Sequence, residues 1–299
     1  VSAGNQRYTS DSGVLYNAEK TSLLMYPAGK QGAYVMLPTT ETVAAYAFAG
    51  AEGLTAVTLS EALTAISDYS FYGCKSLTTP ALPGSLESLG SYAMAYCPSM
   101  SGTLTIPAPV CSINSYAFQG DISLSGIVIA PESQLTRINY AAFAACGIES
   151  FTVPASVSTM ASEIFTDCPK LLTVTFEADS ELQNLAAWTF SGAAELRQVT
   201  FEPGSQLKIV EAEACKGLKK LQRISLENCT MLSSIDNYAF SGCPELSSIT
   251  LPESLTEIGR YAFYRCTSLN EISIPEAVDF IGRYAFMGTK DLNVFFDAA

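Results

Sequence analysis

The chain repeats itself every 22–25 residues, and this repetition constrains its fold more than any other feature. One anchor position recurs eleven times and is Phe in nine of them. The anchors are Phe48, Phe71, Met94, Phe118, Phe143, Phe165, Phe190, Cys215, Phe240, Phe263 and Phe286. A unit this short cannot bury a core of its own, so the coils are expected to stack and share one continuous core.

The residues around the anchor keep the same register. The position five residues before the anchor is aliphatic or Met in all eleven repeats, and the position directly before it is Ala in eight. After the anchor follows the pattern Leu-x-x-Ile-x-Ile-Pro, as in 246–252 and 269–275. Apolar residues that alternate and end at Pro predict a short strand. One strand per coil predicts a parallel sheet.

The first 34 residues do not follow the repeat. Val14–Tyr16 and Leu23–Tyr26 flank a polar stretch and predict a β-hairpin. Because the open end of a solenoid exposes core and strand edges, we expect this hairpin to cap residues 35–299. The stack is expected to begin with a strand at 34–38. It is expected to end with one at 294–297, where the natural chain continues or a partner seals the edge.

Composition excludes several classes of function. The 299 residues include no His, which removes Ser-His and Cys-His nucleophile pairs and His-bound zinc. With 16 Lys and Arg against 29 Asp and Glu, the net charge of −13 argues against nucleic acid and anionic membrane surfaces as partners. No apolar stretch is long enough to cross a bilayer.

The repeat resembles the BspA-like (bacterial surface antigen A-like) leucine-rich repeat family. The stretch Pro252 to Cys266, PESLTEIGRYAFYRC, follows the family pattern almost position by position, and the resemblance covers about residues 35–299. It implies an α/β repeat solenoid, a right-handed superhelix with a parallel sheet on its concave face. The convex side is then mostly irregular or short-helical, and an N-terminal hairpin often precedes the repeats.

The cysteines form a column. Six of nine lie three residues after the anchor: Cys74, Cys97, Cys146, Cys168, Cys243 and Cys266. This is a core position, where a free Cys acts as a small apolar residue. Disulfides between neighbouring coils are an alternative, but parallel side chains suit the S–S dihedral poorly. No C-x-x-C occurs, so we expect no metal and no cofactor. Cys111 and Cys229 lie off the column and are the thiols to test for reactivity.

Aromatic residues stand two positions before the anchor in eight repeats. They are Tyr46, Tyr69, Tyr92, Tyr116, Trp188, Tyr238, Tyr261 and Tyr284. Such a row indicates that each ring packs against the neighbouring coil. The alternative is an exposed platform for sugar rings or peptide side chains.

The outward position of the expected strand is Ser or Thr in eight repeats. This row is Thr58, Thr105, Thr152, Thr175, Thr200, Ser225, Thr250 and Ser273. The resemblance implies that ligands bind on this face. A Ser/Thr ladder is also an ordinary solvated strand surface.

Two groups of charges interrupt the pattern. Basic residues gather in the repeat anchored at Cys215: Lys208, Lys216, Lys219, Lys220 and Arg223. They form a candidate patch for an acidic partner, with a solvated convex surface as the alternative. Glu177, Asp179 and Glu181 form an acidic stretch, but no D-x-D-x-D-G loop supports calcium there.

The resemblance implies a non-enzymatic protein of the bacterial cell surface, or a secreted one, that adheres to other cells or to host matrix proteins. The alternatives are a carbohydrate-binding module that uses the Tyr/Trp row, and a structural spacer. Neither a signal nor a lipid anchor stands in the 299 residues, and the oligomeric state stays open.

Overall fold

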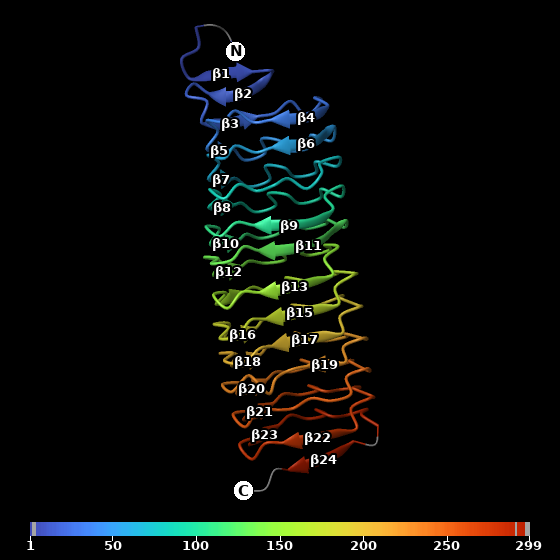
Figure 1. Ribbon diagram of the computed structural model, residues 1–299. Coiled ribbons are helices and arrows are strands. Elements are labelled where there is room, and N and C mark those ends of the chain that lie inside the picture. Colours follow the sequence, from blue (N-terminus) through green and yellow to red (C-terminus); the bar gives the residue numbers. More distant parts are fainter. Residues whose placement is uncertain (2–3, 291, 297–299) are drawn as a thin grey trace. The chain divides into compact units, whose positions relative to one another are not determined.

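The computed structural model describes residues 1, 4–290 and 292–296 (Figure 1). The chain divides into two compact units, Val1–Ile148 and Glu149–Ala299. Both are stacks of coils built from strands and turns, and the described residues contain no helix. None of them therefore forms a helix with the length and apolar character needed to span a bilayer. The expected α/β class with a short-helical convex side is not supported.

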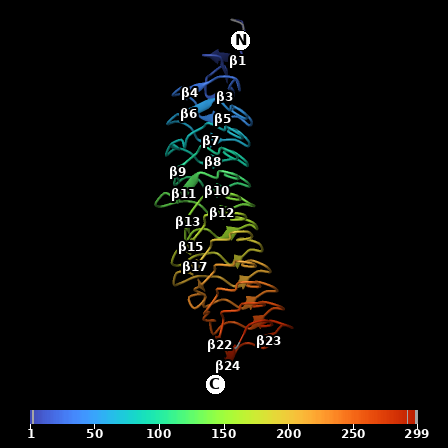
Figure 2. The ribbon, with the colours of Figure 1, turned by 90° about the vertical axis from the view of Figure 1, so that its right-hand side faces the viewer.

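In the first unit, short strands stack in parallel along one side of the coils (Figure 2). They are β5 (Thr42–Val43), β7 (Ala65–Ile66), β8 (Ser88–Leu89), β10 (Ser112–Ile113) and β12 (Arg137–Ile138). Pairing places Val43 beside Ile66, Ile66 beside Leu89 and Leu89 beside Ile113. These are the residues five positions before each anchor, and they are fully buried. The predicted inward column is confirmed here.

Longer strands form a second side of this unit. They are β4 (Gly32–Val35), β6 (Leu54–Thr58), β9 (Gly102–Ile106) and β11 (Leu124–Ile129). β4 pairs in parallel with β6, and β9 with β11. The coil at 78–82 contributes no strand. Pro80 within it has no amide hydrogen to donate to a ladder.

The N-terminal strands differ from the predicted cap. β1 (Tyr8–Asp11), β2 (Val14–Asn17) and β3 (Ser22–Met25) pair in antiparallel order. β3 also pairs in parallel with β5, so it is already part of the stack. The hairpin of β2 and β3 is thus paired with β1 on one edge and with the stack on the other. A separate two-stranded hairpin cap is therefore not supported.

In the second unit the longer strands are β13 (Ser150–Val153), β15 (Thr173–Phe176), β17 (Gln198–Phe201), β19 (Arg223–Ile224), β22 (Glu271–Ile274) and β24 (Asn293–Phe296). β13, β15, β17 and β19 are parallel neighbours, and β22 pairs with β24. The predicted last strand is found at β24, and Asp297 lies outside the described residues.

The short strands of this unit are β14 (Thr159–Met160), β16 (Asn184–Leu185), β18 (Ile209–Val210), β20 (Ser234–Ile235), β21 (Glu257–Ile258) and β23 (Phe280–Ile281). From β16 to β23 they pair in parallel in sequence order. Most coils of this unit thus have a longer-strand side and a short-strand side, as in the first unit.

The anchor lies in a turn on the third side of each coil. The residues two positions before and two positions after it have positive φ in all eleven repeats, for example Tyr69 (57°) and Gly73 (70°). Left-handed residues cannot continue an α-helix. Instead, the amides point at the next coil: Phe48 N donates to Ser70 O at 2.7 Å, and Gly50 N to Tyr72 O at 2.8 Å. A third hydrogen-bonded ladder therefore replaces the expected helical turns.

The core is made of columns. Ten of the eleven anchors are fully buried, and their rings stack, with Phe48 and Phe71 at 4.6 Å between centroids. The column cysteines are buried thiols. Four of them, Cys74, Cys97, Cys243 and Cys266, donate to the anchor carbonyl of the preceding coil, as Cys74 Sγ does to Phe48 O at 3.2 Å. The prediction that these six thiols are buried in the core is confirmed.

Candidate binding surface

The Ser/Thr row falls on the longer-strand side of the coils, but it is not continuous. In the first unit Thr58 and Thr105 are exposed on β6 and β9, with the strandless coil 78–82 between them. In the second unit Thr152, Thr175 and Thr200 are register neighbours on β13, β15 and β17. Thr152, Thr175 and Thr200 therefore form a ladder, in which Thr152 is exposed and the other two are half-buried.

Ser225 interrupts the row. It is 4% exposed, and its hydroxyl accepts from Phe201 N at 2.7 Å and donates to Phe201 O at 3.2 Å. The side chain thus satisfies the neighbouring backbone and presents nothing to a ligand. Beyond it Thr250 and Ser273 are exposed again.

The sheet opens at Ser247–Leu251. The sequence predicts a strand here, yet none forms, and no amide or carbonyl of these five residues bonds to another described backbone group. In the preceding coils the equivalent amides do pair: Gln222 N donates to Arg197 O at 2.9 Å, and Arg197 N to Leu172 O at 2.9 Å. The prediction of a strand at 246–252 is therefore wrong, because the ladder is broken on both sides of this coil.

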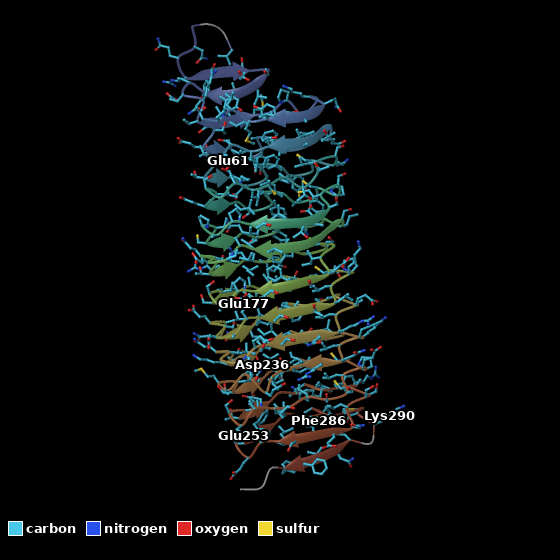
Figure 3. All side chains as sticks on the ribbon, in the orientation of Figure 1. Glu61, Glu177, Asp236, Glu253, Phe286 and Lys290 are labelled. Atoms are coloured by element: carbon cyan, nitrogen blue, oxygen red, sulfur yellow. The ribbon has the colours of Figure 1, made fainter. Side chains whose placement is uncertain are left out.

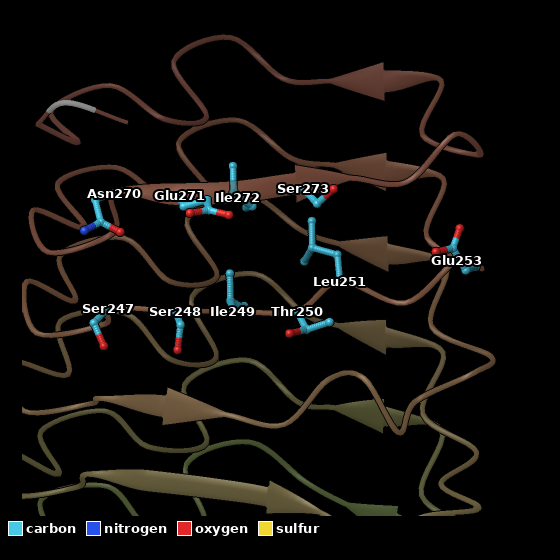
Figure 4. Close-up of a pocket in the computed structure, with 10 residues that line it drawn as sticks. All are labelled: Ser247, Ser248, Ile249, Thr250, Leu251, Glu253, Asn270, Glu271, Ile272 and Ser273. Atoms are coloured by element: carbon cyan, nitrogen blue, oxygen red, sulfur yellow. The ribbon is translucent and has the colours of Figure 1, made fainter. Parts of the chain in front are cut away.

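A hollow of about 390 Å³ lies over this break, between Ser247–Leu251 and β22 (Figure 4). Its residues are Ser247, Ser248, Ile249, Thr250, Leu251, Glu253, Asn270, Glu271, Ile272 and Ser273. Ile249, Leu251 and Ile272 are buried in the core, whereas Thr250, Glu271 and Ser273 are exposed. Two predicted row residues, Thr250 and Ser273, thus line the same hollow.

A second hollow of about 280 Å³ adjoins the first and shares Thr250, Leu251 and Glu253 with it. Its other residues are Glu227, Thr230, Pro252 and Ser254. The described residues lining the two hollows include three carboxylates, at Glu227, Glu253 and Glu271, and no Lys or Arg. Figure 3 shows Glu253 on the side where the longer strands end. This part of the strand face is therefore negatively charged.

The predicted basic patch is spread around its coil. Lys208 lies directly before β18, and Arg223 lies in β19. The anchor turn contains Lys216, Lys219 and Lys220. Four of the five bind neighbours: Lys208 to Gln183 (3.0 Å), Lys216 to Glu213 (2.9 Å), Lys220 to Glu195 (3.4 Å) and Arg223 to Glu227 (3.0 Å). Three of the five thus pair with a carboxylate, which reduces the net positive charge of the group.

The tyrosines of the row stack on one another. Ring centroids are 4.9 Å apart between Tyr46 and Tyr69, 4.6 Å between Tyr69 and Tyr92, and 4.4 Å between Tyr92 and Tyr116, with planes 6–15° apart. Burial between these rings raises the pKa of Tyr92 to about 12. A sugar stacks on a ring face, and within this stack each face is covered by the next ring. The geometry favours the packing interpretation over a sugar platform.

One buried ionisable residue was not singled out in the sequence. Asp121 lies three residues after its anchor, where neighbouring coils have Cys97 and Cys146, and it is fully buried. Its Oδ1 accepts from Cys97 N at 2.7 Å, while Oδ2 has no partner among the described residues. Burial raises the pKa of Asp121 well above its usual range, because the buried site disfavours the charged form of the carboxyl. In the sequence, the signal for this residue was the Asp that replaces Cys in the cysteine column.

The remaining thiols and carboxylates are the other candidate metal ligands among the described residues. Cys229 is buried, which raises its pKa to about 12, and Cys111 is the one exposed thiol among the nine. In the acidic stretch, Glu177 Oε2 accepts from Ala155 N at 3.1 Å. The part of the chain that the structure describes contains no group of three or more His, Cys, Asp or Glu placed to hold a metal ion.

Comparison with known proteins adds a family and a fold. Residues 41–172 and 172–293 match a family model described as the BspA type leucine rich repeat region, in six copies. No curated protein matches the chain.

Three solved structures resemble the whole chain. A leucine-rich repeat protein from Bacteroides ovatus is 18% identical with a TM-score of 0.52, and the match covers 98% of this chain and 91% of that one. A leucine rich cell surface protein from Faecalibacterium prausnitzii is 20% identical (TM-score 0.50, coverage 100% and 97%). The pneumococcal vaccine antigen PcpA is 18% identical (TM-score 0.55, coverage 98% and 99%). At these identities the likeness shows the fold alone.

Proposed function

Because this chain belongs to the BspA-type leucine-rich repeat family, we propose that it is a bacterial surface or secreted protein that binds other proteins through the longer-strand side of its coils. Adhesion to host matrix proteins or to other cells is the role we propose for that binding. The observation that carries the proposal is the hollow over Ser247–Leu251, on the side where the Ser/Thr row is exposed. The similarity to a leucine rich cell surface protein from Faecalibacterium prausnitzii supports the location.

The mechanism would be recognition by a rigid, repeated surface. Ladders on two or three sides hold the coils, so little conformational entropy is lost when a partner docks. Each short Ser or Thr side chain contributes little, and affinity would come from many contacts along several coils. Such a surface fits an extended partner better than a small molecule.

A binding panel tests this proposal. Purified chain is presented to immobilised extracellular matrix proteins, and binding is measured by biolayer interferometry. The variant Thr250→Arg places a large charged side chain on the strand face, and Ser88→Arg places the same side chain on the short-strand side. We expect Thr250→Arg to reduce binding at least tenfold and Ser88→Arg to leave it unchanged. No binding by the unaltered chain to any member of the panel, as a spacer would show, or equal binding by both variants, would overturn the proposal.

A further inference from the structure

We propose that Trp188, in the anchor turn of its coil, is the platform of a binding site for one sugar ring of a neutral glycan. The anchor turns form a different side of the coils from the longer strands. The inference therefore goes beyond the proposed function and adds a saccharide as a second class of ligand.

The first argument is that the indole of Trp188 is open. Trp188 is the only Trp in the chain and is 46% exposed. It makes no ring contact with another described residue, whereas every tyrosine of the row has a ring partner. The equivalent positions in the two neighbouring coils are Glu163 and Glu213, which have no ring. Apolar ring surface that is stacked elsewhere in the row is therefore left to solvent.

The second argument is that the open indole is held in place. Its Nε1–H donates to Glu213 Oε2 at 3.1 Å, and Lys216 Nζ donates to the same oxygen at 2.9 Å. The hydrogen bonds from Lys216 and Trp188 lower the pKa of Glu213, so this carboxylate is ionised at neutral pH. Hydrogen bonds to a charged acceptor are stronger than those to a neutral one. The indole is thus oriented before a ligand arrives, and little side-chain entropy is lost on binding.

The third argument is the polar groups beside the ring. Glu213 Oε1 accepts no hydrogen bond from a described residue, and the exposed Lys216 ammonium has donors beyond the one that it gives to Glu213. A pyranose has C–H groups that stack on an aromatic face and hydroxyl groups at its rim that both donate and accept. Lys216 repels a cationic ligand, and an apolar one would leave both polar groups unpaired. The combination therefore favours a neutral sugar.

The sugar lies on the side chain and does not enter between the coils. The turn ladder is intact on both sides of Trp188, with Phe165 N bonded to Thr189 O at 2.9 Å and Phe190 N to Ala214 O at 3.4 Å. Glu163 is half-buried, and its carboxylate makes no hydrogen bond or ion pair to a described residue. This side chain can rotate away as a ligand settles on the indole, so no backbone contact has to break.

Tryptophan fluorescence of the full chain tests the site directly, because Trp188 is the only indole. The probes are cellotetraose, maltotetraose, chitotetraose and β-1,4-galactotetraose. We expect at least one of them to change the emission in a saturable way and to protect the indole from quenching by acrylamide. Emission that none of these sugars changes at millimolar concentration would overturn the inference. A response to tetramethylammonium chloride and to no sugar would assign the indole to a cation, and would overturn it as well.

Variants locate the site, with isothermal titration calorimetry of the sugar that gives the largest fluorescence change. Trp188 has left-handed backbone with φ of 57°, which Gly adopts without strain, so Trp188→Gly removes the ring and keeps the turn. We expect it to weaken binding at least tenfold. The matched control is Tyr46→Gly, which removes another exposed ring of the row at φ of 60° and should leave the affinity unchanged. Undiminished binding by Trp188→Gly, or equal losses in both variants, would overturn the site.

Glu213 is a positioning residue in this site, because it holds the indole by its Nε1–H. Glu213→Ala removes that acceptor, so we expect binding to weaken at least fivefold and the fluorescence anisotropy of Trp188 to fall as the ring becomes mobile. Glu213→Gln keeps an oxygen acceptor for Nε1–H and should restore most of the affinity and of the anisotropy. Equal losses in the Ala and Gln variants would contradict the positioning role.

Discussion

The phenol ring of Tyr92 lies face to face with that of Tyr69, with centroids 4.6 Å apart and planes 10° apart. Both residues have left-handed backbone, with φ of 53° and 57°. A non-glycine residue in this conformation costs about 1–2 kcal/mol. Stacking between aromatic rings contributes about 0.5–1.5 kcal/mol in addition to the burial of their apolar surface, and this offsets the backbone cost. The tyrosine column thus stabilises a turn that the backbone alone disfavours.

Substitutions at Tyr92 separate these two effects. Tyr92→Ala keeps the left-handed strain and loses the stack, whereas Tyr92→Gly loses the stack and relieves the strain. We expect the Ala variant to be less stable than the Gly variant by about 1 kcal/mol, the reverse of the usual order in a strand. Urea unfolding monitored by circular dichroism measures the difference. An Ala variant that is the more stable would contradict the role of the strained turn.

Glycines seven residues after the strand-end proline mark close approaches between coils. A Cβ at Gly259 would overlap the backbone of Asp236 and Asn237 in the preceding coil. We therefore expect Gly259→Ala to cost more than about 2 kcal/mol through overpacking. Gly84 has free space around its Cβ position, so Gly84→Ala is the matched control and should be neutral. Thermal unfolding gives the melting temperatures of the two variants. Equal melting temperatures would contradict the predicted overlap.

Asp121 makes stability depend on pH. Because burial raises its pKa in the folded chain, its carboxyl contributes full stability below the unfolded pKa of about 4, and this is lost as the pH rises through the folded value. Asp121→Asn keeps the shape without the ionisation. Between pH 4.5 and 7.5 we expect its stability to rise relative to the unaltered chain, by up to about 1.4 kcal/mol per pH unit.

Urea unfolding at several pH values checks this, with Asp279→Asn as the exposed control. Parallel pH profiles of the Asp121 variant and the unaltered chain would show that the carboxyl ionises normally.

The cysteine column predicts the pattern of thiol labelling. Eight cysteines are buried and Cys111 is exposed. We expect one thiol per native chain to react quickly with a disulfide reagent, and all nine to react after denaturation. In Cys111→Ser the fast phase should vanish. Two or more fast thiols in the native chain would contradict the buried column.

Much of the fold could be predicted from the repeat, because an inward column needs the same kind of residue in every coil. Val43, Ile66 and Leu89 lie in register, as their common spacing to the anchor indicated. The left-handed turns that replace the expected helical ones could not be predicted in this way. The true signal was the glycine two residues after the anchor, as at Gly50 and Gly73, which is typical of a left-handed turn.

The candidate site was predicted less well. Ser225 fits the outward pattern, yet it turns inward to bond the backbone of Phe201. Thr250 and Ser273 were named only as members of a row, and nothing in their spacing showed that the ladder opens beside them. Whether two coils pair depends on the backbone geometry of both. The sequence pattern of a single repeat does not describe that geometry.

By itself, the sequence determined the stacking of coils, the buried cysteine column and the acidic character of the chain. Each of these depends on residue type at a repeated position, and burial of apolar surface enforces it in every coil alike. Only the tertiary structure decided that the Asp121 carboxyl is buried with no partner for Oδ2 among the described residues, and that the backbone of Ser247–Leu251 is unpaired. These features arise from contacts between particular neighbouring coils, so no single repeat records them.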